Sequence, residues 1–153
     1  TTAMLETIVK TSDDRAALIL RLALGIVMFP HGAQKALGWF GGGGVGGTLE
    51  FFSSALGVPA VLALLVIAAE FLGAIGLIVG LFTRVAAAGI VAVMLGAVAM
   101  VHWQVGFFMN WGGAQQGEGF EYHLLAIGMG LALVILGGGT GSLDREVVAP
   151  RLG

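Results

Sequence analysis

Four apolar stretches, each close to the length of a membrane-crossing helix, limit most strongly what this chain can fold into. An α-helix needs about 20 residues to cross the roughly 30 Å hydrocarbon core of a bilayer. The stretches cover residues 16–34, 59–81, 85–103 and 122–138, and the last is the shortest. They predict an all-α integral membrane protein built as a bundle of four transmembrane helices.

The composition of the chain also indicates that lipid, and not water, surrounds most of it. Of 153 residues, 58% are hydrophobic and 10% are charged, whereas soluble domains carry about 25% charged residues. So few charges cannot cover the apolar surface, so the expected first partner is the lipid bilayer. The net charge of −2 argues against a nucleic-acid partner. Because the sequence has no Cys, its own side chains supply no disulfide, thiolate ligand or CxxC redox centre.

The distribution of positive charge predicts the orientation of the bundle. The Lys and Arg residues on the side that holds both termini are Lys10, Arg15, Arg84, Arg145 and Arg151, and Lys35 alone falls on the other side. The positive-inside rule then places both termini in the cytoplasm, in a multi-pass protein of the cytoplasmic (inner) membrane. Residues 1–15 and 139–153 become cytoplasmic tails around a membrane domain of residues 16–138. Charges within residues 1–15 argue against a signal peptide.

The connections between the stretches carry fewer signals. The glycine-rich run of residues 41–47 predicts a flexible turn, because no strand precedes it and no GK[ST] follows it to make a phosphate loop. Residues 48–56, with two Phe, predict a short interfacial helix in this first outer loop. Residues 82–84 predict a tight turn, so the second and third helices should be antiparallel neighbours.

Small residues recur at the spacing of one helix face in the second and third stretches. They are Gly73, Gly76 and Gly80 in the second, and Gly89, Ala92, Gly96 and Ala99 in the third. Such faces let helix backbones approach closely in a membrane. The expected role of these residues is therefore tight packing of the bundle.

Charged side chains inside the stretches need a specific explanation, because they are costly in hydrocarbon. Arg21 and Glu70 are the clear cases, and we expect an intramembrane ion pair between them that Arg84 extends. This pair would fix the helix register, or it would handle protons or bind a ligand. Snorkelling to the interface is a further possibility for Arg21.

The three histidines are expected at one depth near the outer surface. His31, His102 and His123 lie roughly 21 to 26 Å from the inner boundary at the rise of an α-helix. Three further residues lie close to this level and are expected to bind a ligand beside the histidines: Lys35, Trp103 and Tyr122. One interpretation is an interfacial belt of polar and aromatic side chains. The other is a quinone pocket in which the histidines are the catalytic candidates and hydrogen-bond or protonate the headgroup.

Paired histidines also raise the question of a haem or a metal. Opposed His side chains on two helices can ligate a b-type haem, but no repeated haem-ligand spacing is present. Haem is therefore not expected, and no metal site is assigned, since three-His zinc would need a convergence that sequence does not reveal.

Two strings in this sequence resemble the DoxX-like family of small membrane proteins. The first is Arg21-x3-Gly25-x3-Phe29-x2-Gly32-x2-Lys35, and the second is Glu70-x2-Gly73-x2-Gly76-x3-Gly80-x2-Thr83-Arg84. The plan of four helices agrees, and the resemblance covers about residues 15–136. It implies a relation to subunits of a thiosulfate:quinone oxidoreductase and to other membrane redox complexes. It implies no established catalytic role for any of the matching residues.

Two functions from different classes follow as hypotheses. The first is a quinone-interacting subunit of a membrane oxidoreductase. The second is a non-catalytic accessory subunit that braces a larger complex through its glycine-rich faces and outer loops. Both imply other membrane or peripheral protein subunits as partners. A small transporter is a weaker hypothesis, because no inverted repeat or discontinuous helix is visible.

Overall fold

The computed structural model describes residues 2–151, and within them it is helical with no strand. Three helices are long and apolar enough to cross a membrane: α2 (Arg15–Leu37), α4 (Ala60–Val79), and the continuous helix Thr83–His102, which joins α5 (Thr83–Ala97) to a π-type turn, η2 (Val98–His102). A fourth apolar helix, α6 (Glu121–Leu136), is about 24 Å long. The all-α class is confirmed, and the crossing of α6 stays a prediction.

Shorter helices lie outside these four. They are α1 (Thr2–Val9), η1 (Trp39–Gly41), α3 (Gly44–Leu56), η3 (Asp144–Val148) and η4 (Ala149–Arg151). The predicted N-terminal tail thus holds a helix, α1. The predicted flexible turn of residues 41–47 is partly wrong, because α3 already begins at Gly44. Packing of α3 against α2 and α4 outweighs the low helix propensity of its glycines.

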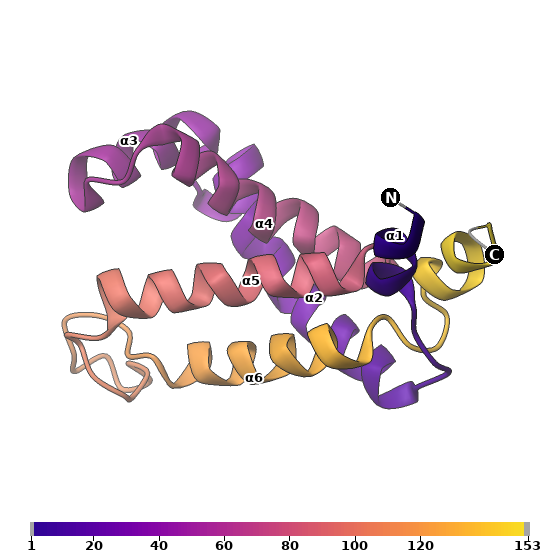
Figure 1. The fold of residues 1–153 in the computed structure, drawn as a ribbon. Helices are drawn as coiled ribbons and strands as arrows, with labels where there is room; N and C mark the ends of the chain where they lie inside the picture. The colour runs from indigo at the N-terminus through magenta and orange to yellow at the C-terminus, as the bar shows by residue number, and fades with distance from the viewer. Residues whose placement is uncertain (1, 152–153) are drawn as a thin grey trace.

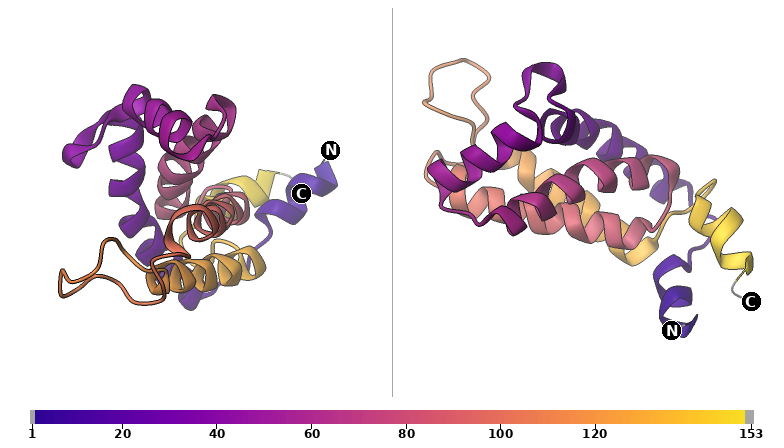
Figure 2. Two further views of the ribbon diagram at one scale, coloured as in Figure 1. Left: turned by 90° about the vertical axis from the view of Figure 1, so that its left-hand side faces the viewer. Right: turned by 90° about the horizontal axis from the view of Figure 1, so that it is seen from above.

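The four apolar helices form an elongated bundle whose two ends differ (Figure 1). Helix α2 packs against α4, and α5 packs against both α4 and α6. Both termini, α1 and the C-terminal turns lie together at one end, called the terminal end here (Figure 2). Helix α3 and the long connection before α6 lie at the opposite end, called the loop end. Which side of the membrane each end faces stays a prediction.

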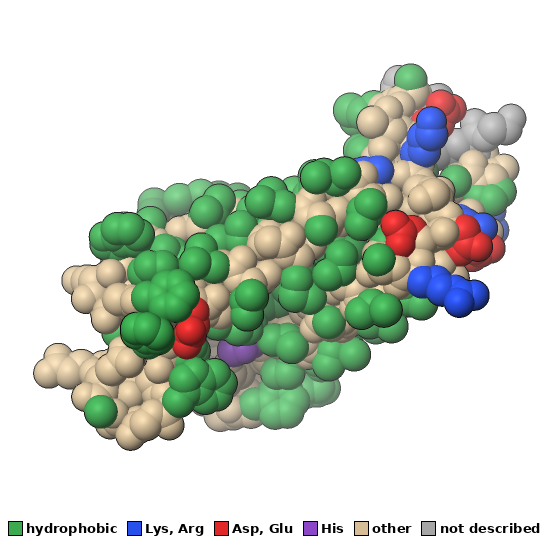
Figure 3. Space-filling view, turned by 90° about the horizontal axis from the view of Figure 1, so that it is seen from below, with side chains coloured by type: hydrophobic (Ala, Val, Ile, Leu, Met, Phe, Trp, Pro, Cys, Tyr) green, Lys and Arg blue, Asp and Glu red, His purple; other side chains and the backbone are tan. Residues whose placement is uncertain are grey.

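The surface of the bundle suits contact with lipid. Hydrophobic side chains cover its middle, and most of the Lys, Arg, Asp and Glu visible on this face lie near the termini (Figure 3). Large apolar side chains point outward from every long helix; examples are Ile19 and Ile26 on α2, Leu72 on α4, Leu95 on α5, and Leu125 and Ile135 on α6. In water such a surface would be an aggregation hazard. In a bilayer it is the expected surface of contact with the acyl chains.

Two glycines allow α2 and α4 to cross at close range. A Cβ added at Gly32 would lie 2.5 Å from the Cα of Phe71, and one added at Gly25 would lie 2.9 Å from Cγ1 of Ile78. The obstacle at Gly32 is backbone, which cannot rotate away. The crossing therefore requires glycine at this position.

We predict that Gly32→Ala lowers the free energy of unfolding by about 1–3 kcal/mol or more, the usual cost of overpacking a tight contact. The matched control is Gly128→Ala on α6, where an added Cβ meets nothing within 4 Å. That change should be neutral or stabilising, because Ala is the better helix former. Unfolding by SDS in mixed micelles measures both. Equal stability of the two variants would contradict the close crossing.

Arg21 is buried at the terminal end and does not pair with Glu70, so the predicted ion pair is wrong. All its N–H groups donate to backbone carbonyls: those of Leu77 and Ile78 at the end of α4, and those of Gly138, Thr140 and Gly141 after α6, at 2.6 to 3.1 Å. The last carbonyls of a helix lack partners within it and carry partial negative charge. Arg21 thus caps the end of α4 and binds the segment that follows α6, and a carbonyl cluster takes the place of the expected carboxylate.

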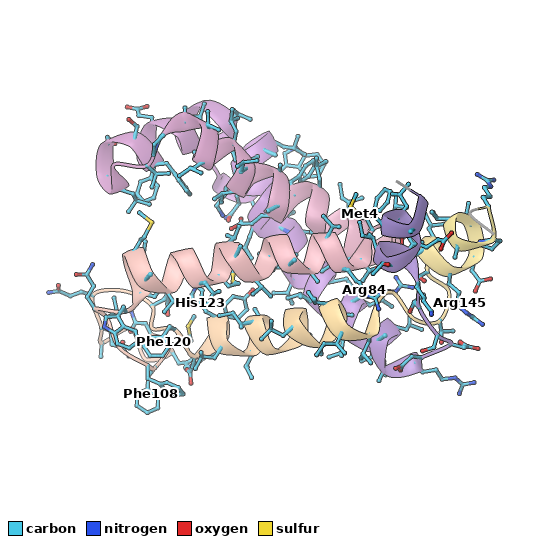
Figure 4. All side chains as sticks on the ribbon, viewed as in Figure 1. Met4, Arg84, Phe108, Phe120, His123 and Arg145 are labelled. Carbon is cyan, nitrogen blue, oxygen red and sulfur yellow. The ribbon has the colours of Figure 1, made fainter. Side chains whose placement is uncertain are left out.

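Arg84 has a related role and does not extend an ion pair with Glu70. Its Nε and Nη2 donate to the carbonyls of Val134 and Ile135 near the end of α6, both at 2.9 Å. Its Nη1 also donates to the carbonyl of Lys10, which ties the N-terminal segment to the bundle. Arg84 lies at the terminal end, far along the bundle from His123 (Figure 4).

Candidate functional site

A cavity of about 780 Å³ lies among α2, α3, α4, α5 and α6, toward the loop end. Its polar lining residues are His31, Lys35, Glu70, His102, Glu118, Tyr122 and His123, and the rest of its lining is apolar or glycine. Sites for small molecules and cofactors typically measure about 300–1,000 Å³ and combine apolar walls with a few polar groups. The cavity has both properties.

The three histidines converge through Tyr122 into one row of rings. The ring centroids of His102 and His123 are 4.1 Å apart, those of Tyr122 and His123 are 5.5 Å apart, and those of His31 and Tyr122 are 6.3 Å apart. The row joins α2, the end of the α5 helix and the start of α6. Figure 4 shows His123 between α5 and α6, and Figure 3 shows a histidine in a hollow between hydrophobic side chains.

His102 is oriented by a backbone carbonyl. Its Nδ1 lies 2.8 Å from the carbonyl oxygen of Glu118. Because a carbonyl oxygen only accepts, Nδ1 carries the proton, and Nε2 of the neutral ring is left as an acceptor. The residue ends η2, a π-type turn, and such turns are frequent at functional sites.

His123 has an unmet hydrogen-bonding group. It is buried, and its Nδ1 has no partner among the residues that the structure describes. A buried polar atom without a partner costs about 1–3 kcal/mol. A ligand that hydrogen-bonds the His123 ring would recover part of this cost.

Lys35 forms the ion pair with Glu70 that sequence reasoning assigned to Arg21. The Nζ of Lys35 lies 2.5 Å from Oε2 of Glu70, and the exposed fractions of the two side chains are 25% and 6%. The close crossing at Gly32, one turn before Lys35, brings the two helices into this register. Lys35 also borders a second, smaller cavity of about 310 Å³ beside the glycine-rich segment and α3. Lys35 therefore borders both cavities, whereas Glu70 lines only the larger one.

The two aromatic neighbours expected in the site have different positions. Tyr122 lines the cavity, and its hydroxyl contacts Sδ of Met28 at 3.5 Å, a weak acceptor. Trp103 is not among the lining residues. It is 68% exposed and stacks on Phe120 with ring centroids 5.5 Å apart.

Sequence reasoning missed most of the apolar wall. Phe51, Phe52 and Leu56 of α3 line the cavity, as do Met94 and Met100 of the α5 helix. The pair of Phe on the predicted interfacial helix was the available signal, but it did not indicate which way the helix folds. Within the described residues, no group of three His, Asp or Glu is arranged to hold a metal ion.

The helices and the cavity define a small multi-pass membrane protein with polar side chains that line a cavity between its helices. The DoxX family profile matches residues 16–103, more than half of the chain. The chain belongs to the DoxX family, as the motifs around Arg21 and Glu70 predict. The matched range contains His31, Lys35, Glu70 and His102, and α6 lies beyond it.

One curated relative gives a further comparison. The chain is 33% identical over 122 residues to the "Putative oxidoreductase CatD" of Bacillus subtilis (strain 168), an alignment that covers 80% of this chain and 81% of that protein. No solved structure matches the chain.

Proposed function

We propose that this chain is a membrane subunit of a quinone-linked oxidoreductase and that its cavity binds the quinone headgroup. Membership of the DoxX family and the name of the Bacillus relative support a redox role in a membrane. The observation that carries the proposal further is the row of hydrogen-bonding rings at one side of a cavity whose other lining residues are mostly apolar.

The lining residues fit the chemistry of a quinone. A quinone headgroup is an apolar ring with two carbonyl acceptors, so it needs apolar walls and a few donors. The rings of His31 and His123 and the Tyr122 hydroxyl can supply donors, and Tyr122 loses only a weak contact with sulfur if it turns to a carbonyl. A bound quinone would exchange two electrons and two protons as it interconverts with hydroquinone.

The residues of this chain would bind the headgroup and move its protons. The tautomer of His102 leaves Nε2 ready to accept a proton from a hydroquinone hydroxyl. His123 stands next in the row and His31 lies beyond Tyr122, so three imidazoles are available as proton carriers. Lys35, in its ion pair with Glu70, lines the same cavity. A partner redox protein would supply or accept the electrons.

The test is quinone binding by the purified chain in lipid nanodiscs, with bound quinone quantified after extraction. We predict that the double variant His102→Phe/His123→Phe weakens binding at least about tenfold, which corresponds to about 1.4 kcal/mol and to the loss of one to two hydrogen bonds. Phe retains the ring volume, so the cavity walls remain.

The control is Gln116→Leu, in the exposed loop outside the cavity, which should bind quinone as the unmodified chain does. Unchanged binding in the double variant would contradict the headgroup site. If the native chain binds no quinone but co-purifies with larger proteins, the accessory-subunit hypothesis would replace the proposal.

A further inference from the structure

Helices α4 and α5 are close near their shared turn and separate toward the loop end. An added Cβ at Gly76 would lie 3.5 Å from Cβ of Ala86 on α5, and one at Gly89 would lie 3.3 Å from Cβ of Ala69 on α4. Two turns further along α5, an added Cβ at Gly96 meets nothing within 4 Å. Figure 1 shows the same divergence between the ribbons of α4 and α5.

Gly96 therefore does not serve the tight packing that its spacing predicts. The expected small-residue face holds at Gly89, where an added Cβ meets α4, and fails at Gly96, where an added Cβ meets nothing. Because Gly96 lines the cavity, its missing side chain leaves space open there. Ala92, one turn earlier, lines the same wall and is exposed.

The rim of this gap is apolar and faces outward. Leu62 and Leu65 of α4 line the cavity and are 52% and 60% exposed, and Met100 at the end of the α5 helix lines it and is 45% exposed. Side chains that both line the cavity and belong to the apolar outer surface mark a place where the two are continuous. In a bilayer, that outer surface contacts acyl chains.

Most polar lining residues of the cavity lie on other helices than its apolar rim. His31 and Lys35 are on α2, and Tyr122 and His123 begin α6, whereas the gap lies between α4 and α5. Glu70 of α4 and His102 at the end of the α5 helix also line the cavity, but the outward-facing rim of the gap is apolar. A ligand with its headgroup at the row of rings would extend its apolar part past Met94 toward the gap.

We propose that the gap between α4 and α5 is a lateral opening through which a hydrocarbon-tailed ligand reaches the cavity from the bilayer, and that Gly96 sets its width. The inference rests on the proposed headgroup site and adds the ligand class, a quinone with a long isoprenoid tail. It excludes a water-soluble aromatic as the natural ligand. The tail lies between α4 and α5 and extends into lipid.

The test compares two probes in nanodiscs: a benzoquinone with a long isoprenoid tail and a ring-matched benzoquinone without a tail. In the Gly96→Leu variant, we expect affinity for the tailed quinone to fall at least about tenfold and affinity for the tailless quinone to stay within about twofold. The matched control is Gly128→Leu on α6, an exposed glycine that also has no atom within 4 Å of an added Cβ and does not line the cavity. It should bind both probes as the native chain does.

A second variant protects the test against misfolding. Ala92→Leu should narrow the same opening and selectively lower the affinity for the tailed quinone. It provides the test if Gly96→Leu does not purify as a folded protein. Unchanged affinity for the tailed quinone in both variants would overturn the lateral opening. Equal loss of both probes would also overturn it, because the substitution would then act on the headgroup site. If the native chain binds neither probe, the proposed quinone-binding function is contradicted, and the lateral opening, which rests on it, is contradicted as well.

Discussion

Replacement of Arg21 by Met is expected to lower the free energy of unfolding by about 3–5 kcal/mol, the largest stability effect of any single change considered. Arg21 is 2% exposed and donates to five backbone carbonyls, two at the end of α4 and three in the segment that follows α6. Hydrogen bonds to a charged group contribute about 1.5–3 kcal/mol each, and the desolvation of the guanidinium offsets part of their sum. Met fills a similar volume but leaves the carbonyls without donors.

The comparison variants separate the hydrogen bonds from the charge. Arg21→Lys keeps the charge but loses the planar set of five donors, so it should recover only part of the stability. Arg15→Met, at the exposed start of α2, should change stability by less than about 0.5 kcal/mol. Unfolding in mixed micelles with SDS measures all three. A loss in Arg21→Met no larger than in Arg15→Met would contradict the capping role.

The second large effect concerns the pair of Lys35 and Glu70. Lys35→Met is expected to cost about 3 kcal/mol at neutral pH, because it leaves a carboxyl that is 6% exposed without its partner. Glu70→Met should cost less, since the Lys35 side chain is 25% exposed and its ammonium can reach solvent. Removal of both charges should cost less than the sum of the single changes.

The measurement is a double-mutant cycle of unfolding free energies. We expect a coupling energy of about 1–3 kcal/mol, the range for groups in direct contact. The parallel cycle with Arg21→Met and Glu70→Met should be additive, because Arg21 donates to carbonyls at the terminal end and not to Glu70. Coupling in the Arg21 cycle and additivity in the Lys35 cycle would reverse the assignment of the pair.

The two arginines show that a charged residue inside the membrane can be identified from the sequence, whereas the groups that it binds cannot. Arg21 and Arg84 each stand out from an apolar surrounding, and each had to be neutralised or hydrogen-bonded. Their partners are main-chain carbonyls. Every residue has a carbonyl, so no side-chain pattern marks which ones are used.

The residues of the candidate site were likewise predictable from the sequence, whereas their arrangement was not. Helical spacing placed three histidines at one depth, but depth alone allowed either a belt around the bundle or a cluster inside it. The packing of α6 beside α5 and across from α2 brings the rings of His102 and His123 to 4.1 Å. Trp103 follows His102 directly and still lies outside the cavity, because neighbours on a helix point in different directions.

Gly89 and Gly96 have the same sequence context and opposite surroundings. Each belongs to the small-residue face of α5, yet an added Cβ at Gly89 meets α4 and one at Gly96 meets nothing within 4 Å. The difference comes from the angle between the two helices, which no local pattern encodes.

The sequence by itself determined that this is an all-helical membrane protein of the DoxX family, where its apolar helices lie, and which polar residues need partners. These properties follow from the hydropathy, spacing and motifs of each segment taken alone. Only the tertiary structure decided that Lys35 pairs with Glu70, that Arg21 binds carbonyls at the end of α4 and after α6, and that the three histidines line one cavity. Pairing and convergence depend on the order, crossing angle and register of helices, and these result from contacts between residues far apart in the chain.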